Sequence, residues 1–492
     1  MKRFLIIAIY IVATAIQLNG QIKLPSLISD NMVLQQNTKA KIWGWSQAND
    51  NITVSTSWDN KKFSTIADDN GKWQLYITTP KYCTGQFLEI LSGYSNKKIK
   101  ISNVLIGEVW LASGQSNMEF WVSPNEELNW MTGMYNYEEE LNDAEYEYIH
   151  LFNVDKSWDY EAPHDNCNGK WVICSKDVAR CHSAIAFLFA RELYNTLNTP
   201  IGIITCAYGG TPVESWTHLD AMQNDSIYKG IFERYTPEKM IPKQYEHKIP
   251  ASIWNAMVNP IVGYTIKGNI WYQAESNAYR ANLYAQMFVN MVKDWRSRWE
   301  QKRLPFYIMQ VAPYGDLPSE IREEQVKVWR QAKSMSDKSL HIKDLEVATT
   351  IDIGDSLDIH PKEKLIPAKR FAKLALAKEY GKNLECFGPI FKSVKAKGKI
   401  LEIKFKHSHG LNIQGENTAY MYIAGKDSVF HKALSKIENG KLLAWSDSVQ
   451  TPVYIKYCTD KFCKGNIYNK AGLPAYPFRG QIKQCYKTIK NK

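Results

Sequence analysis

The chain has 492 residues, more than the roughly 250 to 300 at which a single hydrophobic core stops growing, so two or three domains are expected. Hydrophobic residues make up 45% and charged residues 23%, which is typical of an ordinary globular protein. The net charge of +11 comes from 61 basic and 50 acidic residues scattered along the chain, and no basic stripe or recognition motif indicates a nucleic-acid partner.

Residues 1–20 have the build of a secretory signal peptide. Lys2 and Arg3 precede an apolar run over residues 4–16, and a short polar stretch ends at Gly20. The run is shorter than the roughly 20 apolar residues of a membrane-spanning helix, so export with cleavage near Gly20 is favoured over an N-terminal anchor. No second apolar run is long enough to cross a bilayer. We therefore expect a secreted or periplasmic protein without a membrane span.

Nine cysteines suit an exported chain, and their odd number leaves at least one unpaired. Cys458 and Cys463 are close enough in sequence for a local disulfide. The sequence has no Cys-x-x-Cys pair and no His-Glu-x-x-His motif, so disulfides or buried thiols are expected in preference to a zinc site.

Residues 21–103 are expected to form an N-terminal β-sandwich domain. Apolar and polar residues alternate in short stretches such as 40–45, 51–56 and 72–77, and turn-forming clusters separate these stretches. Alternation with a period of two is typical of strands that bury one face. We expect this domain to support the site without carrying the chemistry.

Residues 104–385 are expected to form an α/β catalytic domain, because buried strands alternate with amphipathic helices. One such helix is expected over 185–197 and another over 367–380, the second opened by a proline and followed by Gly381. This alternation implies a mostly parallel sheet, with ligands at the carboxyl ends of its strands. The expected strands are residues 104–112, 201–207, 268–273, 305–311 and 347–351.

The alternating pattern of strands returns after Cys386. Strands are expected over 390–394, 399–405 and 453–457. Residues 386–492 are therefore expected to form a second β region at the C-terminal end of the chain.

The buried strand at 104–112 ends in Gly114-Gln115-Ser116-Asn117, which puts a hydroxyl at the end of the strand. A serine in such a position more often simply caps the following helix. A helix that starts just after Ser116, however, offers free N–H groups and the positive end of its dipole, and both stabilise an anion near the serine oxygen. Together with the motifs that follow, this pattern predicts Ser116 as the nucleophile of a serine esterase.

A serine hydroxyl needs a base, because it is a poor nucleophile at neutral pH. The segment Asp358-Ile359-His360-Pro361 supplies an imidazole with a carboxylate two residues before it. We expect His360 to be the base and Asp358 to hold its ring in the useful tautomer. Asp352 and Asp355 are rival partners for the histidine, and Asp358 could instead be a capping or loop residue.

The tetrahedral intermediate of ester cleavage carries a negative oxygen that needs about three donors. The Ser116 amide, the amide of Gly210 and the side-chain amide of Gln273 are the expected donors, and losing one such donor typically costs about 10² to 10³ in rate. Glycine at 209 and 210 lets the backbone approach the substrate closely, although a simple tight turn would also account for it.

These motifs together resemble the sialate O-acetylesterase family of the SGNH-hydrolase superfamily, which also contains xylan and other carbohydrate acetylesterases. The resemblance implies a flavodoxin-like, three-layer α/β/α catalytic domain with β-sandwich regions N- and C-terminal to it. The matching segments follow one another along nearly all of the mature chain, at residues 29–35, 114–118, 209–216, 254–257, 272–277, 358–361, 472–475 and 477–479.

By this resemblance Ser116 is the nucleophile, His360 the base, Asp358 its partner, and Gly210 and Gln273 oxyanion donors. The residues expected to contact the substrate are Gly209, Glu275, Asn277 and Arg280.

Ala274 departs from the family pattern, which usually has glycine after the glutamine. If the position needs a positive φ, the strand end shifts and Gln273 is misplaced. This departure motivates an alternative outside the enzymes, a carbohydrate-binding or scaffold protein whose esterase site has decayed.

The predicted function is removal of O-acetyl groups from sialic acids through a covalent acetyl-serine, with no metal or organic cofactor and no obligatory protein partner. The alternative within the enzymes is an acetylesterase for xylan or another glycan. Sialic acid carries a carboxylate, so its recognition should use a cation such as Arg280, Arg322 or Arg330, whereas neutral xylan needs only aromatic platforms.

Overall fold

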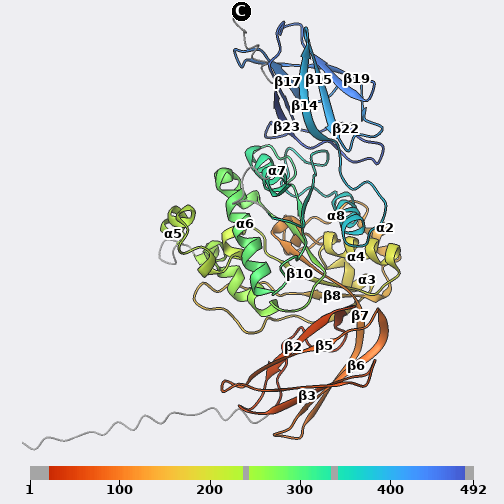
Figure 1. The fold of residues 1–492 in the computed structure, drawn as a ribbon, viewed down its shortest axis with the longest axis vertical. Coiled ribbons are helices and arrows are strands. Elements are labelled where there is room, and N and C mark those ends of the chain that lie inside the picture. Colours follow the sequence, from red (N-terminus) through yellow and green to blue (C-terminus); the bar gives the residue numbers. More distant parts are fainter. Residues whose placement is uncertain (1–20, 236–242, 334–341, 483–492) are drawn as a thin grey trace, which may run out of the picture.

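The computed structural model describes residues 21–235, 243–333 and 342–482 of the chain (Figure 1). The predicted signal peptide, residues 1–20, lies outside the described residues. Strands at both ends of the chain flank a central part in which helices surround a sheet, and the whole is a mixed α/β fold. Of the helices in the described ranges, none combines the length and apolar character needed to span a bilayer.

The N-terminal strands follow the alternation predicted from the sequence, because every second residue of β2 and of β5 is buried. These two strands pair with each other in antiparallel fashion, and β3 pairs with β4 on one side and β6 on the other. The strands of this part are β1 (Val33–Gln35), β2 (Lys39–Trp45), β3 (Asn51–Thr56), β4 (Lys62–Ile66), β5 (Lys72–Thr78) and β6 (Cys83–Ser92).

Strand β7 (Lys98–Gly114) joins the N-terminal strands to the central sheet. Its first half pairs with β6 in antiparallel fashion, and its second half lies between β11 and β10 as the middle strand of a parallel sheet. Every residue from Val104 to Gly114 is buried, which agrees with the apolar run in the sequence. One continuous buried core therefore extends from the N-terminal strands through the central sheet.

The central sheet has the order β13-β12-β11-β7-β10-β8-β9, and all neighbours are parallel except β8 and β9. The five strands predicted here are confirmed, with shifts of a few residues at some ends, whereas β8 and β9 were not expected. The strands other than β7 are β8 (Tyr146–Asn153), β9 (Trp171–Cys174), β10 (Ile201–Ala207), β11 (Gly268–Tyr272), β12 (Phe306–Met309) and β13 (Leu345–Ala348).

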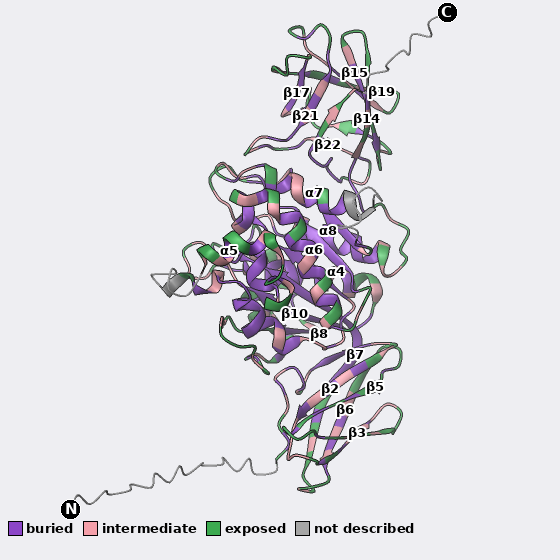
Figure 2. Ribbon diagram, turned by 60° about the vertical axis from the view of Figure 1, so that its left-hand side comes forward, coloured by how far each residue is buried: buried purple, intermediate pink, exposed green. Residues whose placement is uncertain are grey.

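The longer helices pack in two pairs, α4 with α8 and α6 with α7, and turn their buried faces towards the sheet (Figure 2). The Ser183 hydroxyl caps α4 by accepting a hydrogen bond from the Ala186 N–H at 3.1 Å. Both predicted helices are confirmed as α4 and α8. The helices are α1 (Ser116–Glu119), α2 (Tyr137–Asn142), α3 (Lys176–Arg180), α4 (Ala184–Leu197), α5 (Lys229–Arg234), α6 (Ala281–Arg298), α7 (Glu320–Lys333) and α8 (Leu365–Lys378).

The C-terminal strands have a buried core of their own, which includes Leu401, Ile423 and Ile455. They form two four-stranded sheets, β14-β15-β20-β19 and β18-β17-β21-β23, and a pair, β16-β22. The described cysteines, Cys458 and Cys463 among them, carry no disulfide. The strands are β14 (Ile390–Lys397), β15 (Ile400–Lys406), β16 (Asn412–Ile413), β17 (Met421–Ala424), β18 (Phe430–Lys432), β19 (Leu434–Glu438), β20 (Lys441–Trp445), β21 (Tyr454–Tyr457), β22 (Ile467–Tyr468) and β23 (Phe478–Gln481).

Candidate active site

Ser116 lies just beyond the carboxyl end of β7, in the middle of the parallel sheet, and is the first residue of α1. The strand ends at Gly114 with φ +144°, where an added Cβ would lie 2.1 Å from the carbonyl oxygen of Tyr272, so only glycine is accommodated. The first N–H groups of a helix have no intrahelical partner, which leaves the Ser116 N–H available to a ligand. The sheet therefore presents this hydroxyl at the edge where parallel sheets bind ligands.

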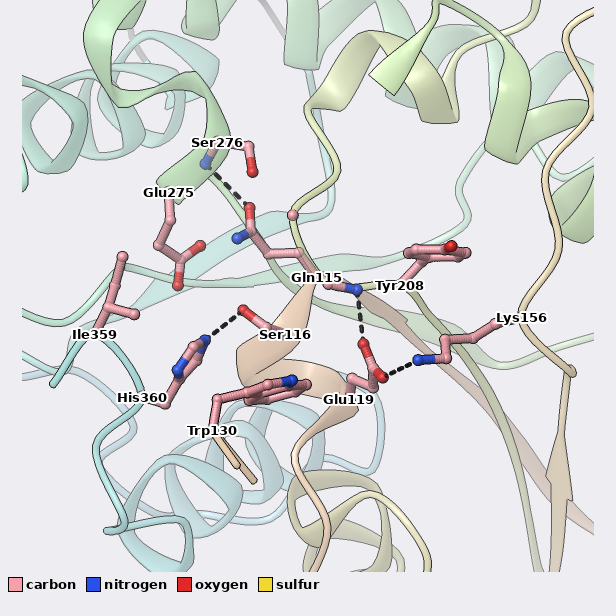
Figure 3. A pocket seen from close by; sticks show the side chains of 12 residues that line it. Gln115, Ser116, Glu119, Trp130, Lys156, Tyr208, Glu275, Ser276, Ile359 and His360 are labelled. Carbon is pink, nitrogen blue, oxygen red and sulfur yellow. Dashed lines mark hydrogen bonds and ion pairs between the residues drawn. The ribbon is translucent and has the colours of Figure 1, made fainter. Parts of the chain in front are cut away.

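The imidazole of His360 lies against the Ser116 hydroxyl, with Nε2 2.8 Å from Oγ (Figure 3). The indole of Trp130 lies close to the imidazole, with 4.7 Å between the ring centroids. Burial, together with the positive charge of Lys364, lowers the pKa of His360 to about 4. The ring is therefore neutral at neutral pH, which is the form that can accept a proton from serine.

The carboxylate of Asp358 faces both the backbone and the ring of His360. Its Oδ1 accepts a hydrogen bond from the His360 N–H at 2.8 Å and lies 3.6 Å from Nδ1. The second distance is longer than a hydrogen bond, so the carboxylate acts on the imidazole mainly through its charge. That charge raises the pKa of His360 and partly opposes the effects of burial and of Lys364.

The two rival aspartates have other partners. Asp352 forms a bidentate pair with Arg370, at 2.7 Å for each oxygen. Asp355 accepts hydrogen bonds from the N–H groups of Leu357 and Asp358 and so shapes the loop. Of the three aspartates considered from the sequence, Asp358 is the one that pairs with the ring.

The turn at Gly209 and Gly210 approaches the serine closely. A Cβ added to Gly209 would lie 3.3 Å from the Cβ of Ser116 and 3.1 Å from Oε2 of Glu119. The Gly209 N–H donates to that Glu119 oxygen at 2.6 Å, so this amide is occupied. Gly210 follows at φ +74°, a conformation that favours glycine, and lines the same cavity as Ser116.

Gln273 and Asn277 do not have the roles predicted for them. Both side chains are fully buried, and the Gln273 amide donates to the Thr211 carbonyl at 3.1 Å and to Asn277 Oδ1 at 2.8 Å. Asn277 Oδ1 also accepts from the Val213 N–H, and its Nδ2 donates to Glu214. Buried donors must be paired inside the protein, and this pairing directs both amides away from the cavity. They support the turn after Gly210, and neither is free to contact a substrate.

The cavity over Ser116 has a volume of about 400 Å³ (Figure 3). Glu275, one of the predicted substrate-binding residues, is at its wall. Its Oε1 accepts from Asn117 Nδ2 at 2.7 Å, and burial raises its pKa. The lining residues are Gln115, Ser116, Glu119, Trp130, Lys156, Tyr208, Gly209, Gly210, Glu275, Ser276, Ile359 and His360.

Two of the three arginines considered for a substrate carboxylate, Arg280 and Arg322, are not among the residues that line this cavity. Arg280 forms an ion pair with the fully buried Glu214 and lies over the ring of Tyr235. Arg322 is buried against the C-terminal strands, where it donates to the carbonyl oxygens of Asp460 and Lys461. The side chain of Arg330 lies outside the described residues. Buried guanidinium groups need partners, and these pairings hold Arg280 and Arg322 away from the substrate.

Among the described residues that line the cavity, the lysine is Lys156, which the sequence analysis did not single out. Its Nζ lies 2.8 Å from Oε1 of Glu119 and 5.5 Å from the centre of the Tyr208 ring. Glu119 could have been noticed as an acidic residue in the first turn of the helix that follows the nucleophile. Lys156 and Trp130 lie in irregular segments, and no motif marks them.

A buried serine at the end of a central parallel strand, paired with a neutral histidine over a cavity, is the arrangement of a serine hydrolase. A family model described as "Carbohydrate esterase, sialic acid-specific acetylesterase" matches residues 106–365, more than half of the chain. The protein therefore belongs to this family of carbohydrate esterases.

Known relatives agree with this assignment. Sialate O-acetylesterase of Rattus norvegicus is 28% identical over 434 residues, which cover 77% of this chain and 78% of the relative. The protein of that name from Homo sapiens is 29% identical over 399 residues, with 74% and 72% covered. A carbohydrate acetylesterase from Xanthomonas citri has a similar structure, with a TM-score of 0.80, 28% identity and coverage of 94% of this chain and 100% of that chain.

Proposed function

We propose that this esterase removes O-acetyl groups from sialic acids through a covalent acetyl-serine at Ser116. The observation that carries the proposal is the 2.8 Å separation between the Ser116 hydroxyl and a neutral His360 ring at the wall of a cavity. The named relatives support the acetyl ester as the bond that is cleaved. The alternative of a decayed site rested on Ala274, yet the serine and histidine lie within hydrogen-bonding distance in its presence.

In the first half of the reaction, Ser116 Oγ attacks the acetyl carbonyl while His360 Nε2 takes the hydroxyl proton. The intermediate oxygen is held by the N–H groups of Ser116 and Gly210. The intermediate then collapses, the bond to the sugar oxygen breaks, and the imidazolium returns the proton to that oxygen. Asp358 stabilises the imidazolium through its negative charge. In the second half, water takes the place of the sugar and acetate is released.

In this proposal Lys156 binds the carboxylate of the substrate. The ammonium group of this residue lies at the cavity wall, and its side chain is about half exposed. A sialic acid carboxylate could displace Glu119 from this ammonium or bind beside it. A neutral acetylated glycan such as xylan is the second candidate, because Glu119 already balances the charge of Lys156.

The proposed function extends to the domains and to export. We take residues 104–385 as an SGNH-type, three-layer α/β/α domain, supported by the parallel order of the central sheet. Residues 21–103 and 386–492 are the flanking β-sandwich regions. Residues 1–20 direct secretion and are then removed.

The test compares acetate release from O-acetylated sialic acid and from acetylated xylan, with Ser116→Ala as the blank. The proposal predicts preferential release from sialic acid. It also predicts that Lys156→Met raises KM for sialic acid by about 10-fold to 100-fold, which is the loss of one charged hydrogen bond, while KM for xylan is unchanged. Faster turnover of xylan, with no effect of Lys156→Met on either substrate, would favour the second candidate.

A further inference from the structure

Three segments that are distant in sequence meet beside the Ser116–His360 pair through the side chain of Asn117. Its Nδ2 donates to Glu275 Oε1 at 2.7 Å and to the carbonyl oxygen of Ile359, the residue before His360, at 3.0 Å. Its Oδ1 accepts from the Nζ of Lys364 at 2.7 Å. Asn117 is only 1% exposed, so these partners are its substitutes for water. The side chain therefore ties the nucleophile segment to the histidine loop.

Lys364 is an unusual member of this group, because it is a lysine with only 1% of its surface exposed. Its ammonium group lies 4.4 Å from the centre of the Phe120 ring, in addition to its hydrogen bond to Asn117. Burial lowers the pKa of this lysine, and the negative charges of three acidic residues raise it: Glu275, Asp358 and Glu363. The acyl transfer described above uses Ser116 and His360 directly and assigns no role to this buried cation.

We propose that Lys364 is a positioning residue with two effects on the esterase reaction. Its hydrogen bond fixes Asn117, which holds the His360 loop against the Ser116 segment. Its positive charge adds to the effect of burial in keeping the His360 ring unprotonated and therefore able to act as a base. This inference rests on the proposed roles of Ser116 and His360.

The charges around His360 give the sign of the second effect. The positive charge of Lys364 disfavours protonation of the His360 ring, whereas the negative charge of Asp358 favours it. Glu275 acts on Lys364 through its negative charge and shares Asn117 with it as a hydrogen-bond partner. The Trp130 ring that lies close to the imidazole is uncharged. Burial lowers the pKa of Lys364 to about 7, and the pKa of His360 is about 4. Lys364 is therefore still positive throughout the range in which His360 titrates.

Two substitutions separate the charge from the hydrogen bond. Lys364→Met removes both, whereas Lys364→Gln removes the charge and keeps a donor for Asn117. The assay is the pH dependence of kcat/KM for an aryl acetate, which reports groups of the free enzyme. We expect the acid limb to move up by about one pH unit in both variants. We also expect kcat at neutral pH to fall further in Lys364→Met than in Lys364→Gln.

Lys369→Met is the matched control, because it removes an exposed lysine from α8, the helix that begins directly after Lys364, and its profile should equal that of wild type. Folded variants with an unmoved acid limb would overturn the inference, even if their rates fell evenly at all pH values, because that is the result of a purely structural role. If neither variant folds, the pKa of His360 is measured by NMR titration of the wild type. A lowered pKa is the expected result, to which burial also contributes, and an ordinary pKa of about 6.5 would refute the proposal. Full activity of Ser116→Ala would instead refute the proposed function itself.

Discussion

Glu119 provides a sensitive test of how the oxyanion site is built. It lies one helical turn after Ser116, is 8% exposed, and accepts hydrogen bonds from the Gly209 N–H at 2.6 Å and from Lys156 at 2.8 Å. The first of these bonds holds the turn that presents Gly210. We therefore expect substitutions of Glu119 to reduce acyl transfer although the residue takes no proton in the reaction.

The size of the effect follows from the kind of bond that is lost. A hydrogen bond to a charged group contributes about 1.5 to 3 kcal/mol and a neutral one about 0.5 to 1.5 kcal/mol. Glu119→Gln keeps an acceptor for Gly209 and loses about 1 kcal/mol, which is a decrease of roughly fivefold in kcat. Glu119→Ala leaves the Gly209 N–H unpaired and lets the turn move, so that one oxyanion donor is displaced at a cost of about 10² in kcat.

The assay is hydrolysis of an aryl acetate at neutral pH, because this substrate lacks the sugar and reports acyl transfer alone. Thermal melting followed by circular dichroism verifies that each variant is folded. Glu127→Gln, at an exposed glutamate of the loop that carries Trp130, is the control and should behave as wild type. A folded Glu119→Ala variant with wild-type kcat would refute the reasoning, because the turn would then not depend on this carboxylate.

Three further predictions concern the base, its partner and the strand end. The activity should persist into acid, and kcat/KM should halve near pH 4, because a lowered pKa keeps His360 neutral above that value; a midpoint near 6.5 would contradict this. Asp358→Ala should lower kcat by at least about tenfold through loss of the charge beside the ring, whereas Asp355→Ala should change kcat much less, and equal losses would argue against Asp358 as the partner. Ala274→Gly should raise the free energy of unfolding by about 1 kcal/mol, because φ at this buried residue is +154°. Backbone strain of this kind costs about 1 to 3 kcal/mol, which exceeds the entropic cost of glycine. Urea unfolding measures the change, and a lower stability of the variant would show that Ala274 is unstrained.

The sequence predicts the central sheet well because its strands are buried on both faces and therefore appear as uninterrupted apolar runs. The run that ends at Ser116 is the clearest example, and it proved to be the middle strand β7. The partner histidine was predictable because an aspartate, a histidine and a proline stand together at residues 358–361. Both predictions depend on local sequence patterns, whose meaning does not change with the positions of distant segments.

Gln273 as a donor, and Arg280 and Arg322 as cations, are not among the residues that line the cavity, for a physical reason that local patterns do not contain. Gln273 is next to the site in sequence, but its amide is used by Thr211 and Asn277. Arg280 is drawn away by the buried charge of Glu214. Which of two neighbouring polar groups faces a cavity is decided by the hydrogen bonds available behind it, and these come from distant segments.

The most direct test of the account is to identify the residue that carries the acetyl group during turnover. The protein is mixed with an aryl acetate, quenched in acid and digested, and its peptides are analysed by mass spectrometry. The account predicts acetylation of Ser116, loss of the modification in Ser116→Ala, and slow formation of it in His360→Ala. An acetyl group on a different residue, or undiminished acetate release by Ser116→Ala, would contradict it.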